Sequence, residues 1–233
     1  IIDAETVIRL DPTDDEGHSN LAILCRKSGK LTEAEKSIAT AIELNPESST
    51  YRIIQARITE LLKEVTRSEN IYKTLIKRDP TNPIALNEYG SYLYRIGNMR
   101  QALTIHEKAA ELEPENSDIL YNLGKSFHAL GKHNDAKLAL NKSIALCPNN
   151  EEAYHALGVI FFEESNFDTA AHQFTKSSRL LSQTYLLTCY LEVGSLSDFR
   201  LQLKKLIESS NVNAMLGSAV SRAELKFKVK IHN

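Results

Sequence analysis

Residues 119–148 read ILYNLGKSFHALGKHNDAKLALNKSIALCP, which is two apolar stripes separated by a glycine. Apolar residues recur at spacings of three and four from Ile119 to Leu130, and this predicts an amphipathic helix. Gly131 then interrupts the run, as a glycine does just beyond a helix C-terminus. A second stripe runs on to Pro148, which ends it because proline lacks the amide donor and disfavours helix in the preceding residue. The stretch therefore predicts two helices joined by a short turn.

The same unit recurs along the chain with a period of 34 residues. Five of the six prolines lie at this interval, and leucine stands two residues before four of these five. A helix pair of this size cannot bury its apolar stripe alone, whereas pairs stacked in series can. The residues in register are Pro12, Pro46, Pro80, Pro114 and Pro148; Gly29, Gly97 and Gly131; and Ala34, Ala102, Ala136 and Ala170.

This pattern resembles the tetratricopeptide repeat (TPR), which places Leu-Gly in the first helix, a glycine at the turn, alanines in the second helix and proline at the end. The fourth unit matches with Leu123-Gly124, Phe127 and Gly131. The second unit, about residues 49–82, departs most, because Lys63 stands at the position of the turn glycine. The resemblance covers roughly residues 1–210. It implies an all-α fold, a right-handed αα superhelix (TPR solenoid) of about five to six helix pairs.

The two ends differ from the regular units. Residues 1–12 end in Leu-Asp-Pro and are predicted to be the second helix of a truncated upstream repeat, so that the array proper spans residues 13–210. Residues 211–233 are predicted to form one more helix, from Val212 to Arg222, and then a β-strand, because apolar and basic residues alternate strictly from Leu225 to Ile231. This tail is either a frayed end or the start of a missing β domain.

Composition narrows the class of function. Twenty-eight basic and 30 acidic residues give a net charge of −2, so the chain has no overall positive charge that would attract nucleic acid. No apolar run approaches the roughly 20 residues that cross a bilayer. The three cysteines are widely spaced and form no CxxC pair, which fits a reducing compartment and argues against a disulfide framework. We therefore predict a cytoplasmic protein with no nucleic-acid or membrane partner.

The resemblance also implies a ligand surface. In stacked TPR units the first helices line a concave groove. Amides in such a groove can bond the backbone of an extended peptide, and aromatic rings can cover its apolar side chains. The predicted groove residues are Asn20, Arg57, Asn87, Tyr94, Tyr121, Asn122, Lys125, His128 and His155.

One subclass of the family grips the C-terminal carboxylate of chaperones with a clamp of lysines and asparagines. Asn20 and Asn122 stand at one clamp position, but the flanking lysines are absent, so chaperone-tail binding is not predicted. Arg57, Arg95 and Lys125 could still meet an acidic ligand.

Catalytic and metal-binding motifs are missing from the sequence. It contains no GxSxG, Walker-type GxxxxGK[ST], GxGxxG or HExxH. His133 and Asp135 spell HxD, the start of an iron-binding facial triad, but they fall at a predicted turn and are interpreted as an accidental match. His128 and His133 are five residues apart, the wrong spacing for metal ligation from one helical face. No cofactor or metal is predicted.

The leading hypothesis is a non-catalytic scaffold that holds a protein or peptide in the groove, with self-association through its terminal repeats as a further option. The alternative is that the chain is the N-terminal TPR region of a larger enzyme, a glycosyl- or sulfotransferase or an Fe(II)/2-oxoglutarate oxygenase. Residues 213–229 resemble the junction that leads into the β-helix of such oxygenases. Recognition of RNA by helical repeats is a third reading, and the acidic bulk of the chain speaks against it.

Overall fold

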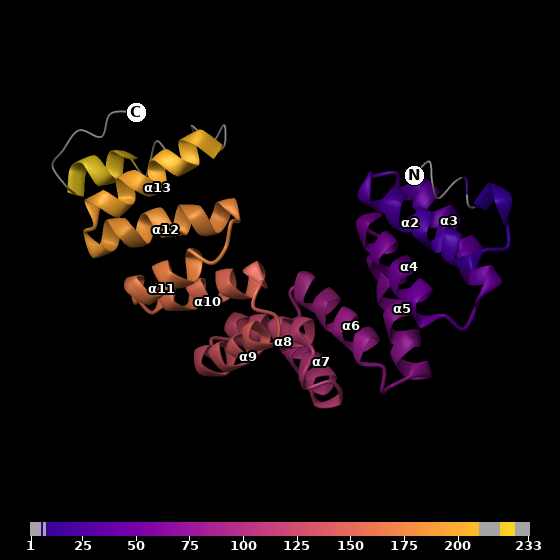
Figure 1. The fold of residues 1–233 in the computed structure, drawn as a ribbon. Helices are drawn as coiled ribbons and strands as arrows, with labels where there is room; N and C mark the ends of the chain where they lie inside the picture. The colour runs from indigo at the N-terminus through magenta and orange to yellow at the C-terminus, as the bar shows by residue number, and fades with distance from the viewer. Residues whose placement is uncertain (1–5, 7, 210–219, 227–233) are drawn as a thin grey trace. The chain divides into compact units, whose positions relative to one another are not determined.

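The computed structural model describes residues 6, 8–209 and 220–226, and this part of the chain is built of helices and contains no strand (Figure 1). None of the described helices combines the length and apolar character needed to span a membrane. The helices that form the pairs are α2 (Asp15–Lys27), α3 (Leu31–Leu44), α4 (Ser49–Leu61), α5 (Val65–Arg78), α6 (Pro83–Arg95), α7 (Met99–Leu112), α8 (Ser117–Ala129), α9 (His133–Leu146), α10 (Glu151–Glu163), α11 (Phe167–Phe174), α12 (Leu180–Val193) and α13 (Leu196–Ser209).

The chain divides into two compact units, residues 1–113 and 114–233. In the first unit the pairs α2–α3, α4–α5 and α6–α7 pack side by side, and the first helices α2, α4 and α6 also contact one another in sequence. The second unit repeats this arrangement with the pairs α8–α9, α10–α11 and α12–α13 and with the first helices α8, α10 and α12. Each unit is therefore a stack of helix pairs, as the period of 34 residues predicts.

The first helix of every regular unit begins at a side-chain cap. Two residues after each in-register proline, an oxygen of an Asp, Ser or Asn side chain accepts a hydrogen bond from the backbone N–H three residues further on. This contact satisfies one of the donors that a helix N-terminus leaves unpaired. The cap residues are Asp14, Ser48, Asn82, Asn116 and Asn150.

The turn between the two helices requires a left-handed backbone. Gly29, Gly97 and Gly131 have φ values of 77°, 87° and 72°. Lys63 and Ser165 stand in the same register and adopt the same conformation, with φ values of 62° and 60°. The backbone thus keeps the repeat geometry even where the sequence lacks glycine.

Close packing of the two helices explains the Leu-Gly motif. A Cβ atom built on Gly124 would lie 2.7 Å from Cγ of Leu140, and one on Gly158 would lie 2.7 Å from Cε1 of Phe174. Leu140 and Phe174 are fully buried, so they have little space into which to move. The glycine lets the second helix approach the first.

The C-terminal strand prediction is wrong for the residues that can be checked. Leu225 and Lys226 belong to a helix over residues 220–226, and Ala223 of this helix is buried in a cluster with Leu187 and Leu203. Val220 and Ala223, three residues apart, form an apolar helix face that packs on this cluster, and this packing outweighed the alternating pattern that follows. The remainder of the predicted strand, residues 227–231, and most of the predicted helix from Val212 lie outside the described residues.

The irregular end of the array follows the slip in the sequence period. The second helices α3, α5, α7 and α9 each have 14 residues, whereas α11 has eight. The final pair α12–α13 turns at Gly194, which is left-handed with φ of 87°. At the other end, residues 6 and 8–10 are helical and precede Pro12.

Candidate partner-binding faces

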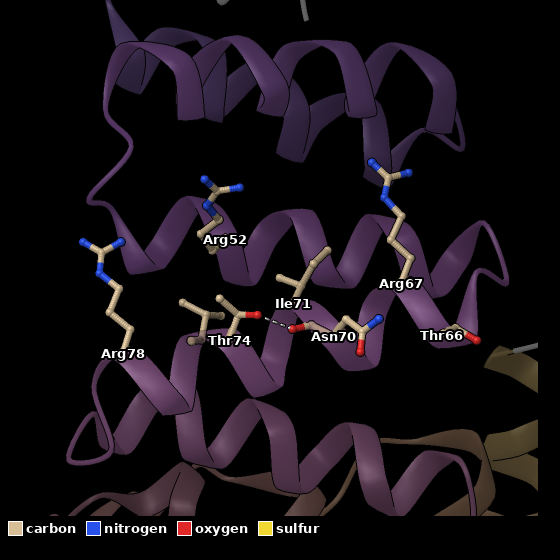
Figure 2. Close-up of a pocket in the computed structure, with 8 residues that line it drawn as sticks. Arg52, Thr66, Arg67, Asn70, Ile71, Thr74 and Arg78 are labelled. Carbon is tan, nitrogen blue, oxygen red and sulfur yellow. Dashed lines mark hydrogen bonds between the residues drawn. The ribbon is translucent and has the colours of Figure 1, made fainter.

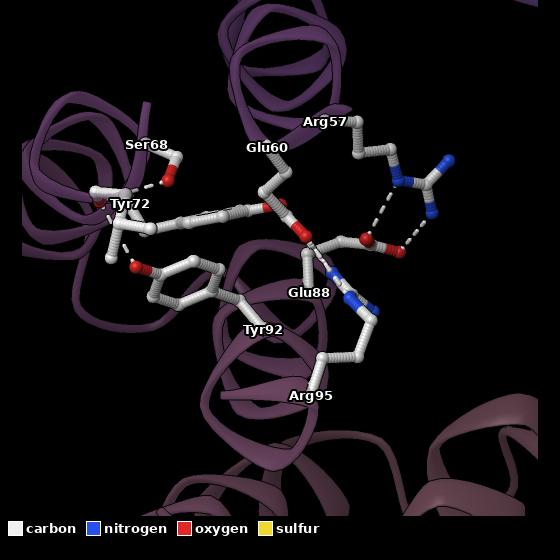
Figure 3. A network of polar contacts seen from close by, with 8 residues as sticks. Arg57, Glu60, Ser68, Tyr72, Glu88, Tyr92 and Arg95 are labelled. Carbon is white, nitrogen blue, oxygen red and sulfur yellow. Dashed lines mark hydrogen bonds and ion pairs between the residues drawn. The ribbon is translucent and has the colours of Figure 1, made fainter. Parts of the chain in front are cut away.

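The first-helix face of the first unit, formed by α2, α4 and α6, carries a network of ion pairs (Figure 3). Arg57 of α4 bonds both carboxylate oxygens of Glu88 on α6, with Nε 2.8 Å from Oε2. Burial lowers the pKa of Arg57, but the hydrogen bonds and charge of Glu88 outweigh it and leave that pKa above its ordinary value. Arg57 is thus held as a cation by the neighbouring repeat.

A second pair runs the other way between the same two helices. Arg95 of α6 donates to Glu60 of α4, with its Nη2 2.7 Å from Oε2 and its Nε 3.0 Å from the same oxygen. Tyr72 of α5 also donates to Glu60, across 2.8 Å, and its buried ring packs 5.3 Å from the ring of Tyr92. Burial, followed by the charge of Glu60, raises the pKa of Tyr72. An acidic ligand at Arg57 or Arg95 would therefore have to displace a carboxylate that is already bound.

The other predicted groove residues of this unit differ in accessibility. Asn20 is exposed on α2, whereas Asn87 on α6 is only 8% exposed and faces the interior. Tyr94 is half-buried, and burial raises its pKa. Asn20 and Tyr94 are the predicted residues here that a partner can reach without breaking an ion pair.

The first-helix face of the second unit, formed by α8, α10 and α12, has a different chemistry. The ammonium group of Lys125 lies 5.0 Å from the ring centroid of Tyr121 on the same helix, which is a cation–π distance. Asn122 between them is half-buried. This part of the face offers an aromatic ring and a cation together.

Aromatic rings continue this face across α10 and α12. Nδ1 of His155 lies 2.9 Å from the hydroxyl of Ser182, and burial, followed by the charge of Arg179, lowers the pKa of this histidine. The half-buried ring of Tyr185 packs edge-on against Phe162, with centroids 5.1 Å apart, and 6.0 Å from the ring of His155. Tyr185 was not predicted, because the period slips after Phe174 and hides its register.

His128 lies at the end of α8 with its Nε2 2.7 Å from Oε2 of Glu163 on α10. His133 begins α9, and its ring centroid is 5.6 Å from that of His128. The two histidines therefore belong to different helices, and the test of ligand spacing along a single helix does not apply to them.

A groove of about 550 Å³ in the first unit lies outside the predicted face (Figure 2). Most of its lining comes from the second helix α5, including the apolar side chains of Ile71 and Leu75, and Figure 2 shows Arg67 and Arg78 toward opposite ends. Arg67 pairs with Glu35 and Glu64, and Arg78 pairs with Glu47. Sequence reasoning missed this groove because it assigned ligand contacts to the first helices alone. The lining residues are Arg52, Thr66, Arg67, Asn70, Ile71, Thr74, Leu75 and Arg78.

Comparison with solved structures shows the same fold. The structure of PilF from Pseudomonas aeruginosa has a TM-score of 0.68 at 21% identity, over 84% of this chain and 93% of that one. PilW, described as a widely conserved type IV pilus biogenesis factor, has a TM-score of 0.76 at 17% identity, over 88% and 97% of the two chains. A chain of the APC/C hetero-tetramer Cut9-Hcn1 has a TM-score of 0.78 at 14% identity, over 94% of this chain and 45% of that one.

Family models agree with these structures, although no curated protein matches the chain. Models described as tetratricopeptide repeat match residues 19–83 and 107–137, and one described as TPR repeat matches residues 124–164. No catalytic family is among the matches, and most of the stretch that resembles an oxygenase junction lies outside the described residues. The chain therefore contains tetratricopeptide repeats, and the fold of this repeat typically serves as a protein-interaction scaffold.

Proposed function

We propose that this chain is a non-catalytic scaffold that binds an extended peptide or a partner domain along the first-helix face of its second unit. The observation that carries the proposal is the run of half-exposed aromatic and cationic groups over α8, α10 and α12, which begins with Tyr121 and Lys125 and ends with Tyr185. Aromatic side chains offer large contact areas and are enriched at interfaces, where they bury apolar groups of the partner.

The contrast between the two units supports this choice. In the first unit Arg57 and Arg95 are each bound by a carboxylate of the adjacent helix, so their charge is already compensated. The ammonium group of Lys125 lies over the ring of Tyr121, and a cation on an aromatic face can attract a carboxylate of a partner. We expect a ligand that offers apolar side chains and at least one acidic group.

The proposed setting is the cytoplasm. The three cysteines are free, and Cys147 is exposed, which suits a reducing compartment where thiols persist. The proposed partners are proteins, including a second copy of the chain through its terminal repeats.

A random peptide library selected on the full chain tests the proposal. Affinities of the enriched peptides are then measured for the chain and for two face variants, Lys125→Glu and Tyr121→Leu, the second of which keeps apolar bulk but removes the ring. Each should weaken binding by about 1 kcal/mol or more, roughly fivefold, as for residues that contribute to an interface.

The matched control is Lys142→Glu, which makes the same charge change on the exposed surface of the second helix α9. Its circular dichroism spectrum and peptide affinity should equal those of the unmodified chain. Peptides that lose affinity equally in Lys142→Glu and Lys125→Glu would show a general charge effect. Peptides insensitive to both face variants would place the binding surface elsewhere.

A further inference from the structure

Three side chains from three helices meet at one end of the α8–α9 pair. Among the described residues, His128, His133 and Glu163 form a group in which one donor atom of each lies within 4.8 Å of the others. Nε2 of His128 is 2.7 Å from Oε2 of Glu163, and Nε2 of His133 is 3.8 Å from the same oxygen. These residues are the end of α8, the start of α9 and the end of α10.

The separations suit a tetrahedral metal ion. A Zn²⁺ ion binds imidazole nitrogen and carboxylate oxygen at about 2.0–2.2 Å, which puts ligand atoms of one tetrahedron roughly 3.3 Å apart. The two distances to Glu163 lie on either side of this value, so small side-chain rotations would equalise them. All three side chains are partly exposed, with 23%, 31% and 45% of their surface accessible, and an ion can enter from solvent.

The surroundings would orient one ligand. Nδ1 of His133 faces Oε1 of Glu164 at 3.6 Å, and Glu164 is itself held by Nζ of Lys137 at 2.8 Å. A histidine that binds a metal through one nitrogen usually donates the other N–H to a carboxylate, which fixes its tautomer. Glu164 is placed to serve this role when Nε2 of His133 binds the ion.

We propose that His128, His133 and Glu163 bind a divalent transition-metal ion, Zn²⁺ above all, with the fourth position left to water or to a side chain of a partner. The donor set of two imidazoles and one carboxylate is of the type that Zn²⁺ accepts, whereas Mg²⁺ and Ca²⁺ prefer oxygen alone. The bound ion would tie the fourth helix pair to the first helix of the fifth. This site shares α8 and α10 with the proposed peptide face but uses none of Tyr121, Lys125 and Tyr185, which carry that proposal.

The full chain, freed of any affinity tag, is titrated with Co²⁺, whose visible absorption is intense in tetrahedral sites, and Zn²⁺ is then added to displace it. We expect one strongly absorbing Co²⁺ ion per chain, released by one equivalent of Zn²⁺. His133→Ala and Glu163→Gln should each weaken Zn²⁺ binding at least tenfold, since even loss of an outer partner costs about 10–100-fold.

His172→Ala is the matched control, because it removes an exposed histidine of α11 that is not in the group. This variant should bind both ions like the unmodified chain. Circular dichroism establishes that the ligand variants are folded, and Zn²⁺ should raise the melting temperature of the unmodified chain but not of His133→Ala. Absence of a tetrahedral Co²⁺ spectrum, or equal Zn²⁺ affinity in all four proteins, would overturn the proposal and leave the contacts as histidine–glutamate hydrogen bonds.

Discussion

Replacing Lys63 with glycine should stabilise the fold. Lys63 holds φ of 62° at the turn between α4 and α5, where the equivalent residues of three other units are glycines. A left-handed backbone costs an L-residue with a Cβ atom about 1–2 kcal/mol. Glycine avoids this cost but loses about 0.5–1 kcal/mol through the greater freedom of its unfolded chain. The net expectation is a gain of about 0.5–1 kcal/mol in the free energy of unfolding.

The turn keeps its hydrogen bonds after the change, so no other term of comparable size enters. The N–H of Lys63 donates to the carbonyl of Glu60 at 2.9 Å, and the next N–H, of Glu64, donates to Thr59 at 3.1 Å. Gly97 and the residue after it make the same two bonds, at 3.1 and 2.8 Å. The side chain of Lys63 is exposed, and its removal opens no cavity.

Urea unfolding followed by far-ultraviolet circular dichroism measures the effect, and hydrogen exchange of the α4 and α5 amides locates it. The reverse change at an equivalent turn, Gly97→Lys, should cost about 0.5–1 kcal/mol by the same balance. Lys132→Gly is the control, because Lys132 is an exposed residue beside a turn glycine but has an ordinary φ of −83°. It should lower the free energy of unfolding by about 0.5–1 kcal/mol, because glycine there adds freedom to the unfolded chain and relieves no strain. If Lys63→Gly instead destabilises the chain as much as Lys132→Gly, the positive φ carries no strain and the reasoning fails.

Three further outcomes are expected. Gly124→Ala should cost about 1–3 kcal/mol in urea unfolding because the new methyl group meets Leu140, and Leu140→Val should recover part of that cost when the two are combined. The lowered pKa of His155 keeps it neutral in the folded chain, so the unfolding free energy should fall as pH drops below about 6.5, and urea midpoints across this range should change less in His155→Gln. A thiol reagent should modify Cys147 quickly in the native chain, whereas Cys189, whose pKa burial raises to about 12, should react only after unfolding, as peptide mass spectrometry can show.

The repeating elements could be predicted from the sequence because each depends on local chemistry. The helix pair from Ile119 to Pro148, its turn at Gly131 and the substitution of Lys63 for a turn glycine all follow from residue type and spacing. The failure at Leu225 has a local cause as well, since a short alternating pattern does not distinguish a strand from the end of a helix whose buried residue, Ala223, lies just before it.

The contacts between successive repeats could not be predicted in the same way. Arg57 bonds a residue 31 positions later, and Arg95 bonds one 35 positions earlier, so each pairing depends on how far one first helix is offset from the next. Until that offset is known, a charged residue on a helix face is expected to be exposed to solvent. His128 and His133 illustrate the same limit. They lie on two helices joined by a turn, so their five-residue separation in the sequence does not tell how close their rings are in the fold.

Because stacking is shared by all the repeats while the exposed side chains are not, the two units can present different surfaces on one backbone plan. Arg57 and Arg95 form ion pairs that link α4 to α6. On α8 the ammonium group of Lys125 lies over the ring of Tyr121, and aromatic residues follow on α10 and α12. A match to the repeat family therefore constrains the buried positions and says little about the ligand. The ligand must be deduced from the accessible side chains, and the aromatic and cationic groups of α8, α10 and α12 are the reason why we propose the second unit.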